Sequence, residues 1–475
     1  MLQKLSSQLF SAFVQISTKL LTFCLVLIVV IFTLKGGHIN LVTAQQTPTA
    51  DFKIFANWCL NKTSLSPDTQ LTISLLLEQA GTKDCSQANQ NLSDLTELQL
   101  NPNFKRLDLS PVQSLTKLTR FQLKYSESSD ITPLKFLTNL TELNLYLNRS
   151  ISDISPLKYL TKLTKLHLES NSISNISPLA SMTQLTSLKL AGNRIRDINS
   201  LKSLTQLTEL GIGSNNISEI SSLKFLKNLT ELYINHNQIS DISSIESLTN
   251  LTTLYINFNS ISNISPLASM TQLTSLKLAG NKIRDINPLK SLTQLTELDI
   301  SFNNISEISS LKFLKNLTKL YIHENQISDI SPIESLTKLA TLYIGQEIVN
   351  FHGGVYSRYQ VGSRSFMFSN KISDLRPLKD LVKLTYFNAA RNEVSNISPL
   401  QELSDLTYLN LNNNKISDLS PLSPLTSLTE LTLYSNKIFD ISPLKSLKKL
   451  TKLNLIDNLI INKTCPVLPQ SICIF

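Results

Sequence analysis

Apolar residues recur along this chain in steps of three that are broken by a single step of two. The stretch SISNISPLASMTQLTSLKLAGN, Ser172–Asn193, follows this rule, and its step of two joins Leu188 to Leu190. An α-helix has 3.6 residues per turn, so steps of three cannot hold one apolar face on it for this long. Side chains two residues apart share one face of a strand. The pattern predicts a short strand at Leu188–Leu190 and tight turns or 3₁₀ segments elsewhere.

The same unit is repeated along most of the chain. The pattern L-T-x-L-x-L-x-x-N recurs about every 22 residues from Asn148 to Asn325 and again from Asn370 to Asn458. Two degenerate units precede it at Leu98–Asn103 and Phe121–Ser126. One unit cannot bury its own apolar side, so neighbouring units must stack. A stack has only neighbour contacts, which allows one elongated domain of this length.

The other end of each unit carries proline, as in ISDISPL at Ile151–Leu157. Proline excludes a long helix there and favours a turn or 3₁₀ segment. Together these features resemble the 22-residue leucine-rich repeats of the bacterial internalins, over roughly Leu92–Ile460. The resemblance implies an α/β solenoid, a horseshoe with a parallel sheet on its concave face and 3₁₀ or turn segments on its convex face. It also implies a ladder of asparagine side chains between the coils.

The first 44 residues predict a targeting segment. Leu20–Leu34 contains 15 uncharged residues, almost all apolar, which is shorter than the about 20 that a spanning helix needs. Val42–Ala44 offers small residues for cleavage, so both a signal peptide and an uncleaved signal anchor remain open. Either one would export the repeats, and an uncleaved anchor would attach them to the membrane through residues 20–34. The expected domains are 1–44, an N-terminal cap at 45–92, the array at 93–460 and a C-terminal cap at 461–475.

The cysteines agree with export, because four of the five bracket the array. Ser66-Pro67-Asp68 predicts the start of a cap helix that contains Leu71–Ala80 and ends at Gly81. A Cys59–Cys85 bond would fix this helix, and a Cys465–Cys473 bond would fasten the last coil. Metal binding is the alternative, but the chain has no C-x-x-C motif.

The cap sequences ANWCLNK, GTKDC and CPVLPQSIC resemble those of exported internalin-like proteins of cyanobacteria. This resemblance implies a bacterial protein that is secreted or held on the extracytoplasmic face of the membrane.

Charge and motifs exclude several function classes. The net charge is +9, but the lysines are spread through the units without the clustered stripe of a nucleic-acid site. The five histidines stand alone, and H-E-x-x-H, P-loop and G-x-S-x-G motifs are absent. We therefore expect no enzyme, no catalytic residues, no metal, no cofactor and no nucleic-acid partner, and a monomeric chain.

A block of four units occurs twice in the chain, and the two copies differ at surface positions. Ser172–Asn259 and Ser260–Glu347 align without gaps and differ at 14 of 88 positions, none of them a core leucine, isoleucine or methionine. Eight changes lie on or just after the expected strands. A fixed core with a varying face is typical of a binding scaffold, although neutral drift would also spare the core.

Aromatic residues gather on the same face. Tyr233 with Tyr255, and Tyr321 with Tyr343, should form two pairs, because neighbouring strands lie about 4.8 Å apart. Exposed aromatics are enriched in binding hot spots, whereas the alternative is packing that only stabilises the sheet. The candidate partner-binding residues are Tyr233, Tyr255, Phe258, Phe302, Tyr321, Tyr343, Tyr386 and Tyr408.

One unit, Ile348–Ser369, keeps the length of a repeat but loses its leucines. We expect a poorly packed coil with a mobile loop, and a flap beside Tyr343 is the alternative. The sequence as a whole predicts an exported scaffold that binds a protein ligand through its concave face. The alternatives are a membrane-anchored adhesion or spacer protein, and a carbohydrate-binding surface protein.

Overall fold

The computed structural model describes residues 52–346 and 369–475. The chain divides into two units, 1–51 and 52–475, and the first lies outside the described residues. The expectations for the targeting segment, Leu20–Leu34 and Val42–Ala44, therefore concern residues that are not described. Within the described part of the chain, no helix combines the length and the apolar character that crossing a membrane requires.

From residue 52 onward, where the structure is described, the N-terminal cap contains three α-helices, where the sequence predicted one. They are α2 (Phe55–Leu60), α3 (Pro67–Ala80) and α4 (Cys85–Ser93). The predicted cap helix is α3: the Ser66 hydroxyl accepts a hydrogen bond from the backbone N–H of Thr69 at 3.2 Å, and Gly81 ends the helix with a φ of 69°. Glycine suits that left-handed position because it has no Cβ.

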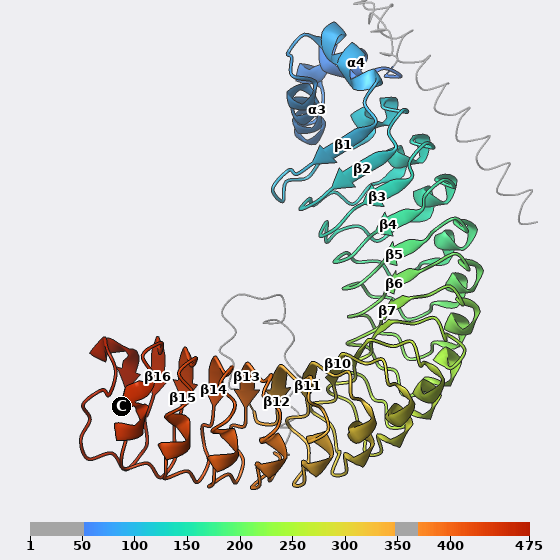
Figure 1. The fold of residues 1–475 in the computed structure, drawn as a ribbon. Coiled ribbons are helices and arrows are strands. Elements are labelled where there is room, and N and C mark those ends of the chain that lie inside the picture. The colour runs from blue at the N-terminus through green and yellow to red at the C-terminus, as the bar shows by residue number, and fades with distance from the viewer. Residues whose placement is uncertain (1–51, 347–368) are drawn as a thin grey trace, which may run out of the picture. The chain divides into compact units, whose positions relative to one another are not determined.

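Over the two described ranges, the array and the C-terminal cap form one parallel sheet of 17 strands, in which each strand pairs with the next along the chain (Figure 1). The core leucines stand in register, as Leu276 does with Leu298 in the neighbouring coil. The strands are β1 (Glu97–Leu100), β2 (Arg120–Leu123), β3 (Glu142–Asn144), β4 (Lys165–His167), β5 (Ser187–Lys189), β6 (Glu209–Gly211), β7 (Glu231–Tyr233), β8 (Thr253–Tyr255), β9 (Ser275–Lys277), β10 (Glu297–Asp299), β11 (Lys319–Tyr321), β12 (Thr341–Tyr343), β13 (Tyr386–Asn388), β14 (Tyr408–Asn410), β15 (Glu430–Thr432), β16 (Lys452–Asn454) and β17 (Cys473–Ile474).

The proline segments form 3₁₀ turns on the side of the stack away from the sheet, such as η9 (Ser265–Ser269) and η10 (Asn287–Ser291) (Figure 1). Between the two layers runs a continuous apolar core. Leu276 and Leu278 are both fully buried in it. The predicted solenoid, with strands on one side and 3₁₀ segments on the other, is confirmed.

An asparagine ladder links the coils, as the resemblance implied. Asn281 donates from Nδ2 to the carbonyl oxygens of Ile256 and Leu278, at 3.1 and 2.9 Å, and its Oδ1 accepts from the N–H of Ile261 at 3.0 Å. Its side chain thus satisfies backbone groups of its own coil and of the preceding one. Buried polar groups need such partners, which explains why asparagine recurs at this position.

The array continues directly across the irregular unit. Most of Ile348–Ser369, for which we expected a poorly packed coil with a mobile loop, lies outside the described residues. On either side of it, β12 pairs with β13, so that Leu342 stands beside Phe387. Asn370 then takes the ladder position of the β12 coil, because its Oδ1 accepts from the N–H of Ile327 at 3.0 Å. The residues flanking the irregular unit therefore belong to one coil.

Disulfide bonds fasten both caps. Cys59 is bonded to Cys85, and Cys465 to Cys473, with Cα–Cα distances of 5.6 and 5.8 Å. The first bond joins α2 to the start of α4, and the second holds the last coil against β17. Both pairings agree with those expected from the sequence.

Candidate functional site on the sheet face

The outer side of the sheet, here called the sheet face, carries the residues that alternate with the core leucines. Four tyrosines on β11 to β14 form a continuous row, the tyrosine ladder. The ring centroids of Tyr321 and Tyr343 lie 4.9 Å apart, those of Tyr343 and Tyr386 4.8 Å, and those of Tyr386 and Tyr408 3.9 Å. All four side chains are half-buried.

The ladder is longer than the sequence predicted. The expected pair of Tyr321 and Tyr343 is present, but Tyr343 also stacks on Tyr386. Tyr386 stands opposite Thr341 in the sheet register, so it belongs to a neighbouring column of residues. The ladder crosses from one column to the next because Tyr386 is the first residue of β13, whereas Tyr343 is the last residue of β12. Residues 347–368 separate the two strands along the chain, which hides this relationship in the sequence.

The other predicted pair lies on β7 and β8. Tyr233 and Tyr255 meet edge to face, with centroids 5.1 Å apart. The Tyr233 hydroxyl donates to Glu231 at 2.6 Å, and burial together with this carboxylate raises the pKa of Tyr233. Lys277 lies 4.4 Å from the ring centroid of Tyr255 and forms a 3.3 Å ion pair with Glu297. This pair is therefore held by charged neighbours, separately from the ladder.

Phe258 and Phe302 occupy the left-handed turn that follows the strands, with φ values of 55° and 52°. Such values are unfavourable for bulky side chains. The Phe258 ring stacks on His236 at 4.4 Å and lies where a Cβ on Gly280 would stand. Phe302 meets His323 edge to face at 5.1 Å. Both phenylalanines thus line one edge of the sheet face.

Two titratable groups with shifted pKa values follow β11 and were missed by the sequence analysis, and the ring of one of them, His323, lies 6.0 Å from that of Tyr343. Burial lowers the pKa of His323 to about 4, and burial raises the pKa of Glu324 to about 7 although Arg391 acts in the opposite direction. Glu324 is 4% exposed, and its Oε1 has no hydrogen-bond partner among the described residues. In the earlier copy of the block these positions hold asparagine and histidine, so the two copies carry different titratable side chains here.

Part of the difference between the copies has a structural cause. Asp299 and Ser301 both replace glycines of the first copy, and the Ser301 hydroxyl donates to Asp299 at 2.6 Å. Gly345 replaces an asparagine, and a Cβ there would stand 2.1 Å from the backbone nitrogen of Ala390. These three changes fit local packing as well as binding.

The sheet face holds a second aromatic group that the sequence analysis also missed. Phe104, Tyr125 and Tyr146 follow β1, β2 and β3, with centroid distances of 5.5 Å between the first two rings and 6.1 Å between the last two. Arg149 lies 5.2 Å from the ring centroid of Phe104. Phe104 and Tyr125 belong to the degenerate units, where the repeat pattern does not reveal that their positions match.

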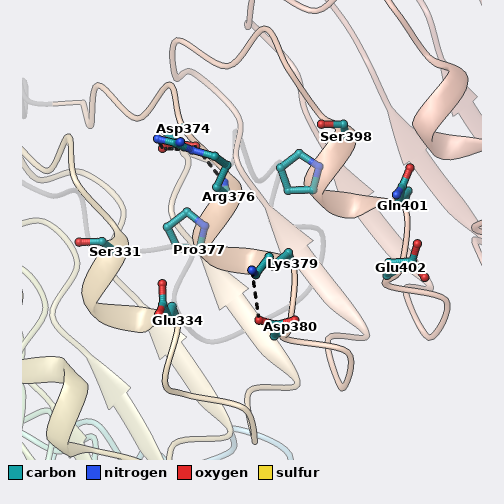
Figure 2. A pocket seen from close by; sticks show the side chains of 11 residues that line it. Ser331, Glu334, Asp374, Arg376, Pro377, Lys379, Asp380, Ser398, Gln401 and Glu402 are labelled. Atoms are coloured by element: carbon teal, nitrogen blue, oxygen red, sulfur yellow. Dashed lines mark hydrogen bonds and ion pairs between the residues drawn. The ribbon is translucent and has the colours of Figure 1, made fainter.

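A hollow of 620 Å³ lies on the 3₁₀ side, between Ser331 and Glu402 (Figure 2). Its cations are held by neighbouring carboxylates: Arg376 contacts Asp374 at 2.7 Å, and Lys379 lies 3.9 Å from Asp380. These are ordinary solvated ion pairs. Across the two described ranges, no cluster of three or more histidine, cysteine or acidic side chains could hold a metal ion.

Comparisons with known proteins agree with the fold. The sequence profile of leucine-rich repeats (two copies) matches residues 138–181, 183–225, 227–269, 271–313, 315–351 and 382–424. A search of curated protein sequences finds no match.

Solved structures give the same result. An internalin of Listeria monocytogenes, inlF, is 36% identical with a TM-score of 0.61, over 67% of this chain and 88% of the internalin chain. The leucine-rich repeat protein LIC12759 of Leptospira interrogans is 24% identical with a TM-score of 0.69, over 80% of this chain and 94% of its own. The functional domain of InlJ from Listeria monocytogenes is 24% identical with a TM-score of 0.65, over 85% and 81%. The chain therefore belongs to the leucine-rich repeat proteins, as an internalin-like member.

Proposed function

We propose that this protein is an exported, monomeric scaffold that binds a protein partner through the tyrosine ladder. The observation that carries the proposal is the unbroken row of four rings over β11 to β14. Tyrosine is enriched in binding hot spots because its large, rigid ring loses little entropy on binding. Four such rings side by side offer anchors on a rigid sheet.

The geometry of the ladder favours a protein over a saccharide at this place. The planes of Tyr386 and Tyr408 are 6° from parallel, and those of Tyr343 and Tyr386 are 19° from parallel. Each of these rings thus covers a face of its neighbour. A sugar ring would need an open aromatic face, whereas a protein surface can contact edges and hydroxyls.

Capture of a partner tests the proposal. The full chain is immobilised and exposed to the secreted and surface proteins of its native surroundings, beside Tyr321→Ala/Tyr343→Ala and Lys290→Ala. Lys290 lies in η10, on the opposite side of the stack, and serves as the matched control. We expect one partner that both the wild type and Lys290→Ala retain and that the tyrosine variant loses. Retention by all three would place binding outside the ladder and would favour a spacer role.

Export has its own test, because it rests on the caps and not on the ladder. In protein recovered from its native host, Cys59, Cys85, Cys465 and Cys473 should resist a thiol reagent until a reductant is added. The two bonds seen between these residues would persist in an oxidising compartment. Labelling of all four without reductant would contradict export. Sequencing the N-terminus of the same material would distinguish a cleaved signal peptide from an anchor.

A further inference from the structure

We propose a second binding site, separate from the tyrosine ladder, that takes an uncharged oligosaccharide in a groove between helix α3 and strands β1 to β3. Two hollows of 390 and 300 Å³ adjoin there, and both are lined by Gln79 and Gln99. Gln122 and Asn144 continue the lining along the sheet. We call this surface, defined by these four residues, the amide groove.

The amides form an ordered array. Gln99 stands beside Gln122, and Gln122 beside Asn144, in the register of three adjacent strands. Gln79 faces them from α3. The side-chain amides of the three glutamines form no hydrogen bond with other described residues. Each offers two N–H donors and an accepting oxygen, which matches hydroxyl groups that both donate and accept.

The charges of the groove oppose an acidic ligand. Arg120 is held in an ion pair by Glu97, and Glu142 and Glu78 add negative charge at the rim. Arg120 is the one cation among the residues that line the two hollows, and it is paired, so an acidic polymer would meet repulsion from the carboxylates at the rim. The apolar residues of the lining, Leu98 and Phe121 among them, are almost all buried under the sheet. A protein partner would therefore find few of the apolar pockets in which hot spots form.

Aromatic rings stand at the end of the same strands. Tyr146 follows Asn144 by two residues, and its N–H donates to Asn144 Oδ1 at 3.0 Å. The rings of Phe104 and Tyr125 meet at 66°, and those of Tyr125 and Tyr146 at 82°. In such an edge-to-face pair one ring keeps its own face clear of its neighbour. The amides can bind the hydroxyl groups of a sugar, and the rings can pack against its C–H face. This combination suits a saccharide.

The test uses the full chain with two uncharged probes, cellohexaose and maltohexaose, and measures binding by isothermal titration. We expect at least one probe to bind in the millimolar range or tighter. Gln99→Ala/Gln122→Ala should weaken its binding at least tenfold. Gln184→Ala/Gln206→Ala, which removes two exposed glutamines of neighbouring coils outside the groove, should leave it unchanged.

Two further measurements keep the outcome decisive. Tyr321→Ala/Tyr343→Ala should retain saccharide binding, which separates this site from the tyrosine ladder. Tyr125→Ala, a second variant that leaves the amides in place, should also weaken binding. The proposal is overturned when neither probe binds the wild type, or when the groove variants and the Gln184/Gln206 control bind equally well.

Discussion

The rings of Tyr386 and Tyr408 stack face to face, with centroids 3.9 Å apart and planes 6° from parallel. The two residues stand in register on β13 and β14, so the strand spacing itself brings the rings together. Aromatic pairs contribute about 0.5–1.5 kcal/mol beyond the area they bury. The stack should therefore stabilise the sheet whether or not a partner is bound.

Tyr408→Ala should lower the free energy of unfolding by about 1–2 kcal/mol, because it removes both the stack and part of the buried area. Tyr408→Phe should cost little, since the ring remains. Chemical denaturation measures both variants. Tyr159→Ala, which removes an exposed ring on the 3₁₀ side, is the control and should change stability by less than about 0.5 kcal/mol. An equal loss in Tyr408→Ala and Tyr159→Ala would show that the stack adds no stability.

Leu276→Ala should cost about 2–5 kcal/mol, because this leucine is fully buried between coils. Lys277→Ala, one residue further, should cost about 1 kcal/mol or less, since it removes a half-exposed cation with its Glu297 and Tyr255 contacts. Thermal unfolding of the two variants compares them directly. Similar losses would mean that the two faces of the strand are wrongly assigned.

Asn281→Ala should destabilise the array by about 1–3 kcal/mol, because it leaves the buried N–H of Ile261 without its partner. The carbonyl oxygens of Ile256 and Leu278 keep their hydrogen bonds from Asn259 and Asn303. Asn304→Ala is the matched control. Asn304 directly follows Asn303, the ladder asparagine of the next coil. Its side chain takes no part in the ladder, so a small effect is expected. Denaturation midpoints distinguish the two, and equal midpoints would remove the ladder as a source of stability.

Glu324 should make stability depend on pH. Burial raises its pKa from the ordinary 4.5 to about 7, so the folded chain keeps a proton that the unfolded chain releases between these values. The contribution of Glu324 to stability therefore falls as the pH rises from 4.5 to 7. His323, whose pKa burial lowers from 6.5 to about 4, acts in the opposite sense between pH 4 and 6.5.

Glu324→Gln removes only the first effect, because His323 is common to both proteins. We compare the free energy of unfolding of the variant with that of the wild type. The difference, variant minus wild type, should be about 1–2 kcal/mol larger at pH 8 than at pH 4.5. Glu334→Gln, an exchange of an exposed carboxylate on the 3₁₀ side, should show no such difference. Melting curves at the two pH values measure it. A pH-independent difference for Glu324→Gln would contradict the burial of an uncompensated carboxyl group.

The repeat pattern predicts the fold well, because each coil repeats the same local rule. The strand at Leu188–Leu190, expected from the step of two, corresponds to β5 at Ser187–Lys189. The cap helix was predictable from Ser66 and Gly81, which have clear local roles. α2 was missed because no side chain caps its start. The start of α4 does carry a cap signal, Asp84 with Gln87 three residues later, which the sequence analysis did not use.

The candidate sites were less predictable. Tyr321 and Tyr343 could be paired from the sequence, since both follow the regular spacing. The link from Tyr343 to Tyr386 spans an interruption of that spacing, so the contact appears only when β12 is seen beside β13. The amide groove needs Gln79 of α3 opposite Gln99 of β1, and no periodicity connects a cap helix to a strand.

The affinity of the captured partner for Tyr321→Ala/Tyr343→Ala tests the central claim most directly. Anchors in a hot spot cost about 2 kcal/mol or more each on truncation, which corresponds to a loss of roughly thirtyfold in affinity per residue. We predict a loss of that size or larger for the double variant, with circular dichroism unchanged and Lys290→Ala binding like the wild type. Wild-type affinity in a folded double variant would contradict the proposal that the tyrosine ladder is the binding site.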